Sequence, residues 1–494
     1  MALDPRTPVI IGVGQHLNRV DHGAEPAEPV ELMLRAVHAA EQDAGAPGAA
    51  AGAGVVGVVP VVSWRYRDPG AILADRVGAA GAATWYPSLG GNTPQLLVNR
   101  VARAIAAGET DLGVVTGGEA YRSRMAAKRA GTDLDWTRQA DDVEPTWHEG
   151  TEFTLGHPAE LARGILMPTQ AYPLFENALW HASGRSRDEH LADVGELWAG
   201  FSRVAAANPF AWRRDAFTAE EIITPTGDNR LVGSPYTKRM VSNPDVDMSS
   251  ALLLCSVERA RALGVSPDRW VFPHSGTDAK DGVMSLRPSF TASSSIGVAG
   301  NRALELAGVG IDDVAHVDLY SCFPSAVQLA LRELDLDRDR RLTVYGGLCF
   351  AGGPWNNPVG HALAAMVDVL RDDPGSVGLV TANGGNVEKH AFGVYSTDPP
   401  AEGFRWECPQ DEVDARGHRE VDGDWAGPVR VEAWTVMHER DGSPARAHAA
   451  CLTPAGIRVW GVSDDADLMA RAGAEDLAGL AGSVDGDGTL TLDD

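Results

Sequence analysis

Two stretches of the chain carry apolar and polar positions in the same order, at residues 89–120 and 345–385. Each passes from a Gly-Gly turn with Asn and Pro into a helical pattern, then through an acidic turn into a short Val-rich run that ends on Gly-Gly. A loop-helix-strand unit that recurs predicts a duplicated α/β architecture. The apolar positions four residues apart are Leu97, Val101 and Ile105, and then Val359, Leu363 and Val367.

The start of each predicted helix matters for chemistry. A helix N-terminus offers unpaired backbone N–H groups and the positive end of the helix dipole. Two such ends that face each other would form a pocket for a thioester oxygen or a thiolate. The sequence therefore predicts that the two glycine turns wall one cavity.

The remaining pattern extends both halves. Strands and helices alternate as β-α-β-α-β, which predicts mostly parallel sheets related by a pseudo-twofold axis. The first half has expected elements at residues 9–13, 29–43, 55–62 and 72–77, and the second at 270–274, 298–307, 316–323 and 325–334. Residues 121–239 are rich in Trp and charge and predict an excursion over one end of the sheet. Residues 247–255 return to a buried strand.

The tail predicts a separate module. Beyond residue 400, short alternating runs at 429–437, 445–452, 456–461 and 489–492 surround one short helix at 465–472. Short antiparallel strands with polar turns and one helix are typical of a small barrel of the OB type. OB-folds often bind single-stranded nucleic acid, but this tail lacks a basic aromatic groove, so we expect a docked structural module.

Composition narrows the classes of function. The 494-residue chain has a net charge of -26, which argues against a nucleic-acid partner. Its five cysteines form no CxxC pair, so we expect reduced thiols in the cytoplasm and no metal. The N-terminus does not match a signal peptide, and Pro47 and Pro60 interrupt the one apolar stretch that suggests a membrane segment.

Several motifs occur in an order and spacing that resemble the thiolase superfamily over residues 8–395. They are AIAAGETDLGVVTGGEA at 104–120, SRDE at 186–189, VDMSSALLLCSVERARALGV at 246–265, HVDLYSCF at 316–323 and GGLCFAGGP at 346–354. The chain is most similar to the sterol-carrier-protein-like (acetyl-CoA acetyltransferase-like) branch and to the type-one thiolase-like proteins with an added C-terminal domain.

This resemblance implies a duplicated α/β thiolase fold of αβαβα layers with an OB-like β-barrel domain at its end. The N-terminal half would comprise residues 1–120 and 240–268, and the C-terminal half residues 269–400. Residues 121–239 would form a loop or lid excursion, and residues 401–494 the added domain.

The resemblance also locates the positions where relatives carry catalytic groups. The nucleophilic cysteine falls on Gly90 and the histidine of the Gly-His-Pro motif on Gly353. The histidine of the His-Asp-Cys-Phe motif falls on Tyr320 and its acidic neighbour on Ser321. The acid/base cysteine near the last Gly-Gly falls within residues 381–383. Glycine can neither attack a thioester nor move a proton, so Gly90 and Gly353 cannot supply the covalent route that the resemblance would imply.

Four other residues are candidates for catalysis. The Tyr320 phenol can donate a hydrogen bond to a thioester oxygen or, with a lowered pKa, move a proton. The alternative is a buried, structural tyrosine whose hydroxyl hydrogen-bonds to the backbone. His361 follows the second helix start and can replace the lost histidine, or serve in packing. Cys349 lies at a turn where a helix dipole can activate a thiol, although inert packing is favoured for it and for Cys322. Asn383 can donate its amide to an oxyanion.

Two further groups complete the predicted site. Backbone and amide donors of the pocket, which also serve as turn and cap residues, are Gly90, Asn92, Gly353, Asn356 and Gly385. Met167 aligns with the segment that contacts coenzyme A in relatives, and Lys238 and Arg239 can meet its phosphates or remain solvated.

We therefore expect a protein that binds an acyl-coenzyme A and acts on it without the usual cysteine. The chemistry would be acyl transfer, or carbon–carbon cleavage as in the thiolase-like aldolases. A coenzyme A-binding or scaffold protein without activity is the alternative. The expected ligand is the thioester itself, with no other cofactor, no nucleic acid and no membrane, in a monomer or a dimer.

Overall fold

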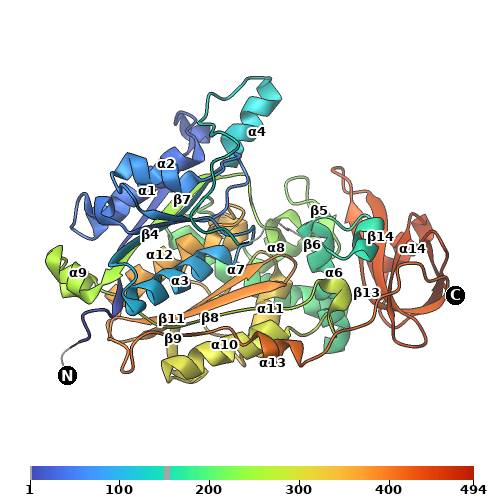
Figure 1. Cartoon of the computed structure of the whole chain (residues 1–494). Helices are drawn as coiled ribbons and strands as arrows, with labels where there is room; N and C mark the ends of the chain where they lie inside the picture. The colour runs from blue at the N-terminus through green and yellow to red at the C-terminus, as the bar shows by residue number, and fades with distance from the viewer. Residues whose placement is uncertain (1–2, 150–155, 494) are drawn as a thin grey trace.

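Two five-stranded sheets form the centre of the molecule in the computed structural model, which describes residues 3–149 and 156–493 (Figure 1). The first sheet has the order β1 (Pro8–Leu17), β7 (Asp247–Ser256), β4 (Leu112–Ala120), β2 (Val55–Val58), β3 (Ala83–Trp85). The second has the order β12 (Arg405–Glu407), β8 (Phe272–Lys280), β11 (Lys389–Ser396), β10 (Val377–Gly384), β9 (Val314–Asp318).

The two sheets repeat one pairing scheme. In the first, β1–β7 and β7–β4 are antiparallel and β4–β2 is parallel. In the second, β8–β11 and β11–β10 are antiparallel and β10–β9 is parallel. The duplication of the α/β unit is therefore confirmed. Four of the five strands in each sheet run in the same direction, as the mostly parallel pattern predicts. β7 and β11 insert antiparallel between strands that the pattern suggested were neighbours.

Helices occupy three layers around these sheets (Figure 1). Between the sheets lie the two repeated helices, α3 (Thr93–Ala107) and α12 (Pro358–Asp372), which contact each other. Both have a proline in the first turn. Backbone N–H groups there have no partner within the helix, so the missing N–H of proline costs no hydrogen bond. The outer layers are α1 (Pro29–Asp43) and α2 (Pro69–Val77) on the first sheet and α10 (Ser294–Ala307) and α11 (Pro324–Glu333) on the second. The short helix α9 (Val257–Ala262) follows β7.

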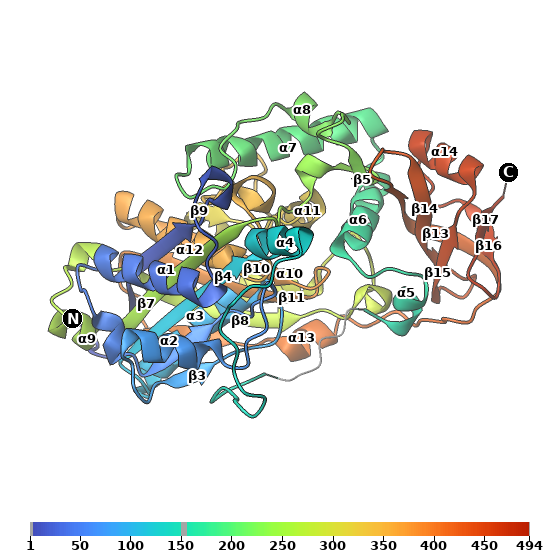
Figure 2. The same ribbon diagram turned by 90° about the horizontal axis from the view of Figure 1, so that it is seen from above.

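The excursion predicted at residues 121–239 lies beside the layers and against the C-terminal part (Figure 2). Its helices α6 and α7 contact α11, and its short strands pair with each other. Its elements are α4 (Tyr121–Ala130), α5 (Pro158–Ala162), α6 (Pro168–Ser183), α7 (Arg187–Ala207), α8 (Ala219–Ile223), β5 (Leu231–Gly233) and β6 (Tyr236–Thr237).

The C-terminal part is a further sheet with the order β15-β14-β13-β16-β17, extended by β5 alongside β13. A single bridge between Val462 and Thr489 joins its two end strands, so a closed OB-like barrel stays a prediction. The proposed start at residue 401 also stays a prediction, and β12 beyond it pairs with β8. The elements are α13 (Gln410–Asp414), β13 (Gly427–His438), β14 (Pro444–Leu452), β15 (Arg458–Ser463), α14 (Ala466–Ala474), β16 (Ala481–Val484) and β17 (Leu490–Leu492).

None of the helices in the described part of the chain has the length and apolar character needed to cross a bilayer. Within residues 3–149 and 156–493, no group of three or more His, Cys, Asp or Glu side chains is arranged to hold a metal ion.

Candidate functional site

The first glycine turn, which leads into α3, packs directly against the turn that ends β10. A Cβ atom added to Gly91 would lie 2.2 Å from the Tyr320 hydroxyl and 2.5 Å from the carbonyl oxygen of Asn383. One added to Gly384 would lie 2.9 Å from the Cα of Gly90. Glycine is needed here because two stretches of backbone approach each other closely.

The second helix start is joined to the first through one asparagine. The Asn356 carbonyl oxygen Oδ1 accepts a hydrogen bond from the Gly90 backbone N–H at 2.9 Å, and its Nδ2 donates to the Pro60 carbonyl at 3.0 Å. Gly353 lies elsewhere in this turn, where its N–H donates to the Asn243 carbonyl at 2.9 Å. The structure therefore brings Asn356, and not Gly353, to the first turn.

We call the meeting point of Gly90, Gly91, Asn92, Tyr320 and Asn383 the junction. Its polar atoms are incompletely paired: the Oδ1 atoms of Asn92 and Asn383 are buried without a hydrogen-bond partner in residues 3–149 and 156–493. The Tyr320 hydroxyl makes no hydrogen bond with the described residues, although the residue is only half-buried. Buried polar atoms in native proteins are almost always bonded, so unpaired ones at one point indicate a place for water or a ligand.

Tyr320 reaches the junction from the segment that follows β9. Its backbone N–H donates to Thr381 Oγ1 at 2.9 Å, which fixes the start of the side chain. Burial, and secondarily the nearby Cys322, raises the Tyr320 pKa well above its ordinary value. Tyr320 therefore remains a neutral phenol that can donate a hydrogen bond, and the lowered pKa considered for proton transfer is not found.

Asn383 is held by a residue that the sequence analysis did not single out. Its Nδ2 donates to the Tyr172 hydroxyl at 3.0 Å, and that hydroxyl donates to the carbonyl of the exposed Gly385 at 3.1 Å. Tyr172 in α6 is fixed by stacking on Phe323, with ring centroids 4.4 Å apart. Its place in the helix after Met167 was the only signal available, because nothing local marks a tyrosine that contacts a turn 211 residues away.

His361 lies in the core on α12. Its Nδ1 pairs with Gln15 Oε1 at 2.8 Å, its ring stacks on Tyr345, and its Nε2 has no partner among the residues that the structure describes. Burial lowers the pKa of His361 to about 3, so the ring is neutral. These contacts favour a packing role over replacement of a catalytic histidine.

The two thiols near the second turn are buried and protonated. Cys349 accepts a hydrogen bond from Trp198 Nε1 at 3.3 Å, and burial raises its pKa far above the ordinary value. Burial likewise raises the pKa of Cys322 to about 12. Because the thiolate is the reactive form, neither cysteine is arranged as a nucleophile.

The residues expected to contact coenzyme A lie outside the junction. Met167 immediately precedes α6 and, with Leu166, has an exposed large apolar side chain, 49% accessible in each case. Lys238 is exposed and Arg239 half-buried in the 3-10 turn Lys238–Met240. Ser242, four residues after Lys238, lies against Gly353. Residues 238–242 therefore connect the two basic residues to the second glycine turn.

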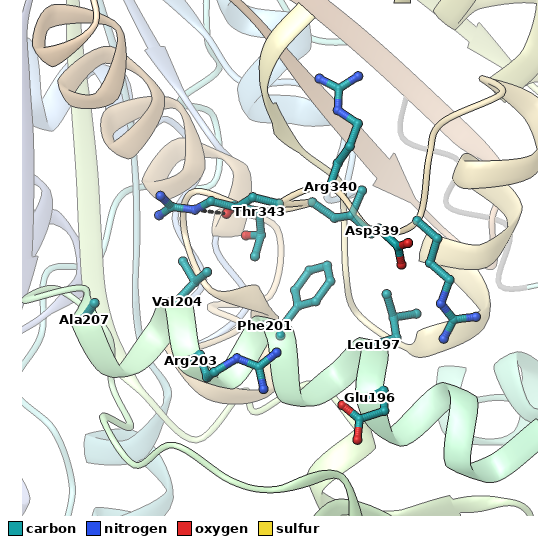
Figure 3. Close-up of a pocket in the computed structure, with 13 residues that line it drawn as sticks. Glu196, Leu197, Phe201, Arg203, Val204, Ala207, Asp339, Arg340 and Thr343 are labelled. Atoms are coloured by element: carbon teal, nitrogen blue, oxygen red, sulfur yellow. Dashed lines mark hydrogen bonds between the residues drawn. The ribbon is translucent and has the colours of Figure 1, made fainter. Parts of the chain in front are cut away.

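A cavity of about 630 Å³ lies apart from all predicted site residues, between α7 and residues 338–343 (Figure 3). Four arginines line it, but three bond neighbouring protein groups. Arg338 pairs with Asp193, Arg340 donates to backbone carbonyls, and Arg341 donates to the Thr343 carbonyl. These bonds hold the loop of residues 338–343 in place, and this structural role accounts for the three arginines.

Two α/β halves that place helix starts face to face between their sheets define a protein of the thiolase fold. The chain shares this fold with the monomeric SCP2-thiolase-like protein type 1 of Mycobacterium smegmatis. That similarity has a TM-score of 0.85 and 31% identity over 99% of this chain and 100% of that one. Residues 409–489 match the family model of the thiolase-like protein type 1 additional C-terminal domain. The chain therefore belongs to the thiolase superfamily, as a type 1 thiolase-like protein with an added C-terminal domain.

Other relatives are more distant. A 3-ketoacyl-CoA thiolase of Stutzerimonas stutzeri is 23% identical over 41% of this chain and 50% of its own length, and one of Chromohalobacter salexigens is 28% identical over 27% and 32%. The chain thus spans half or less of these curated relatives. The Ltp2-ChsH2(DUF35) aldolase shares the fold with a TM-score of 0.59 and 20% identity, over 80% of this chain and 98% of that one.

Proposed function

We propose that this protein binds acyl-coenzyme A thioesters at the junction and acts on them without a nucleophilic cysteine. The carrying observation is the set of unpaired polar atoms on Asn92, Tyr320 and Asn383 around Gly90 and Gly91. A thioester carbonyl is an acceptor, and the Tyr320 hydroxyl is a donor that no described residue uses. Asn92 can turn either end of its amide toward the ligand, whereas the bond from Asn383 Nδ2 to the Tyr172 hydroxyl leaves the Asn383 Oδ1 to accept from a ligand or a water.

Two kinds of chemistry fit this arrangement. In direct acyl transfer, an acceptor attacks the thioester carbon and the coenzyme A thiolate leaves. In carbon–carbon cleavage of a 3-hydroxyacyl thioester, the 3-hydroxyl gives up its proton and becomes a carbonyl as the bond between the α and β carbons breaks. The thioester fragment leaves as an enolate, which then takes up a proton. Both routes place negative charge on the thioester oxygen, where a neutral phenol in a partly buried site stabilises it. The five free cysteines favour a cytoplasmic location for this activity.

The alternative is a coenzyme A-binding protein without activity. It is favoured by Gly90 in place of the nucleophile and by the buried, protonated Cys349. The two functions share the ligand and differ only in turnover.

The experiment is a calorimetric titration with coenzyme A and a panel of acyl thioesters, including 3-keto and 3-hydroxy acyl chains, followed by mass spectrometry of the products. Loss of one oxyanion donor costs about 10²–10³-fold in kcat, and we expect that loss in Tyr320→Phe with binding largely kept. Tyr66→Phe is the matched control, because its hydroxyl bonds Glu28.

Binding without product from any thioester would establish the alternative. Turnover that survives Tyr320→Phe but is lost in Cys349→Ala, with an acylated Cys349 peptide, would assign the chemistry to that thiol.

A further inference from the structure

The hydroxyl of Tyr172 in α6 is fully occupied by hydrogen bonds at the end of β10. It accepts from Asn383 Nδ2 at 3.0 Å and from the Val387 backbone N–H at 3.3 Å, and it donates to the Gly385 carbonyl at 3.1 Å. Burial, and secondarily the nearby Cys322, raises the Tyr172 pKa well above its ordinary value, so the hydroxyl keeps its proton. Because a phenol has one proton to donate, this hydroxyl has none left for a ligand.

These bonds fix the direction of the Asn383 amide. If the amide turned over, its Oδ1 would face the Tyr172 hydroxyl, whose single proton already goes to the Gly385 carbonyl. Nδ2 is the end that can donate to that hydroxyl, so Oδ1 is the end that remains free. This oxygen is buried and has no hydrogen-bond partner among the described residues. The unused group of Asn383 is therefore an acceptor.

The face of β10 that carries Asn383 is the face that Tyr320 contacts. Side chains two residues apart point to one side of a strand, so Asn383 shares its side with Thr381. Thr381 Oγ1 accepts from the Tyr320 backbone N–H at 2.9 Å. A Cβ atom added to Gly91 would lie 2.2 Å from the Tyr320 hydroxyl and 2.5 Å from the Asn383 carbonyl. The junction thus combines a donor on Tyr320 with a fixed acceptor on Asn383.

Asn92 completes this arrangement without deciding its polarity. Its Oδ1 is buried between the two turns, because Cβ atoms added to Gly90 and Gly384 would lie 2.3 Å and 2.4 Å from it. No described residue bonds the Asn92 amide, so it can turn to match whichever ligand group it meets. Selection between ligands therefore depends on Asn383, whose amide is held in one direction.

We infer that Tyr172 is a positioning residue that makes the junction selective for a thioester with a hydroxyl group on its acyl chain. Such a ligand accepts from Tyr320 with its thioester carbonyl and donates to Asn383 Oδ1 with its hydroxyl. A 3-ketoacyl thioester places an acceptor at the same point and leaves Oδ1 unpaired. The ligand class is the 3-hydroxyacyl thioester, which is the substrate that carbon–carbon cleavage requires. The inference rests on the proposed function, since it concerns the ligand of the same site.

The test measures the affinity of the full chain by calorimetry for both enantiomers of 3-hydroxybutyryl-coenzyme A, for acetoacetyl-coenzyme A and for butyryl-coenzyme A. We expect one hydroxyacyl enantiomer to bind about tenfold more tightly than the other two thioesters, the value of one hydrogen bond. In Tyr172→Phe the Asn383 amide is free to turn and donate to a ketone, so the preference over acetoacetyl-coenzyme A should fall to about one. Tyr395→Phe is the matched control, because it removes another buried hydroxyl, which bonds Gln95, and should keep the preference.

Asn383→Leu provides a second variant that keeps Tyr172 and removes the acceptor. Its affinity for 3-hydroxybutyryl-coenzyme A should fall about tenfold, whereas its affinity for butyryl-coenzyme A should change little. The two variants therefore lose the same preference in opposite ways: Tyr172→Phe gains affinity for the ketone, and Asn383→Leu loses affinity for the hydroxyl. Thermal denaturation of both, compared with Tyr395→Phe, shows that they are folded.

The outcomes separate this inference from the proposed function. Thioesters that bind without preference for the hydroxyacyl chain, or a preference that Tyr172→Phe leaves intact, would overturn the inference and leave thioester binding in place. A preference that survives Asn383→Leu would assign the hydroxyl contact to another residue and overturn it as well. Absence of binding for every thioester would remove the proposed function and this inference with it. A preference that depends on Tyr172 supports the inference even if no thioester is turned over.

Discussion

Gly91 shows how closely the two halves approach at the junction. Any side chain there would occupy the space of the Tyr320 hydroxyl and of the Asn383 backbone. The tyrosine can rotate, but the carbonyl of a buried strand cannot move without shifting β10. The glycine therefore sets the position of the backbone that faces Tyr320.

Gly91→Ala should lower the free energy of unfolding by about 1–3 kcal/mol, the usual cost of overpacking. Gly473→Ala in α14 is the control, because a Cβ there meets nothing within 4 Å and alanine favours a helix. Urea denaturation of both variants measures the difference. Equal stabilities would show that the junction is looser than its geometry indicates.

At the scale of elements, one buried arginine connects the C-terminal sheet to the second half through hydrogen bonds. The Arg458 side chain has no solvent exposure and bonds Glu432 at 2.7 Å and 2.8 Å. It also donates to the carbonyls of Met284, Ser285 and Arg287, and the neighbouring Trp460 donates to Ser285 Oγ at 2.8 Å. β15 thus satisfies carbonyls of the turn that follows β8.

Arg458→Met should cost about 3–5 kcal/mol of unfolding free energy, because it leaves Glu432 only the longer ion pair with Arg419 at 3.9 Å and leaves several carbonyls unbonded. Arg446→Met removes an exposed ion pair and should cost no more than about 1 kcal/mol. Guanidinium denaturation compares the two. A similar small loss in both would mean that apolar packing alone holds the sheet in place.

The elements also show where sequence patterns sufficed. The helix at residues 29–43 was predicted at its observed bounds, because one face of α1 is apolar along its whole length. β11 was missed, since Lys389 and His390 begin it and its burial comes from pairing with β8 and β10 and from packing against α3 and α10. For the same reason Tyr172 was missed at the site and His361 was placed there: contacts across layers leave no local signal.

For the whole molecule, burial of uncharged histidines links stability to pH. His361 in α12, His390 in β11 and His448 in β14 have pKa values lowered by burial to about 3, 4 and 4. In the unfolded chain a histidine binds its proton near pH 6.5, so the unfolded state takes up protons that the folded state excludes. Each such histidine therefore destabilises the fold as pH falls below 6.5. Buried carboxyls act oppositely: burial raises the pKa of Asp318 to about 6.

His361→Gln isolates one of these contributions. Between pH 6.5 and about 3, the slope of unfolding free energy against pH should decrease by about 1.4 kcal/mol per pH unit relative to the parent chain. Denaturation curves at several pH values measure the slope, and the carboxyl contributions cancel in the difference. Unchanged slopes would place a proton on His361 in the folded state.

Residue type and local periodicity are enough to predict the duplicated unit, the two helices that begin at glycine turns and the absence of a thiol at Gly90. The packed fold was needed to show that Asn356 bridges the turns, that Tyr320 and Asn383 face Gly91, and that the Tyr172 hydroxyl holds Asn383. The bond between Asn356 and Gly90 joins residues 266 positions apart, and Tyr320 and Asn383 reach Gly91 from other elements of the fold. Their energies depend on which surfaces exclude water together, and that is fixed only when the sheets and helices have packed.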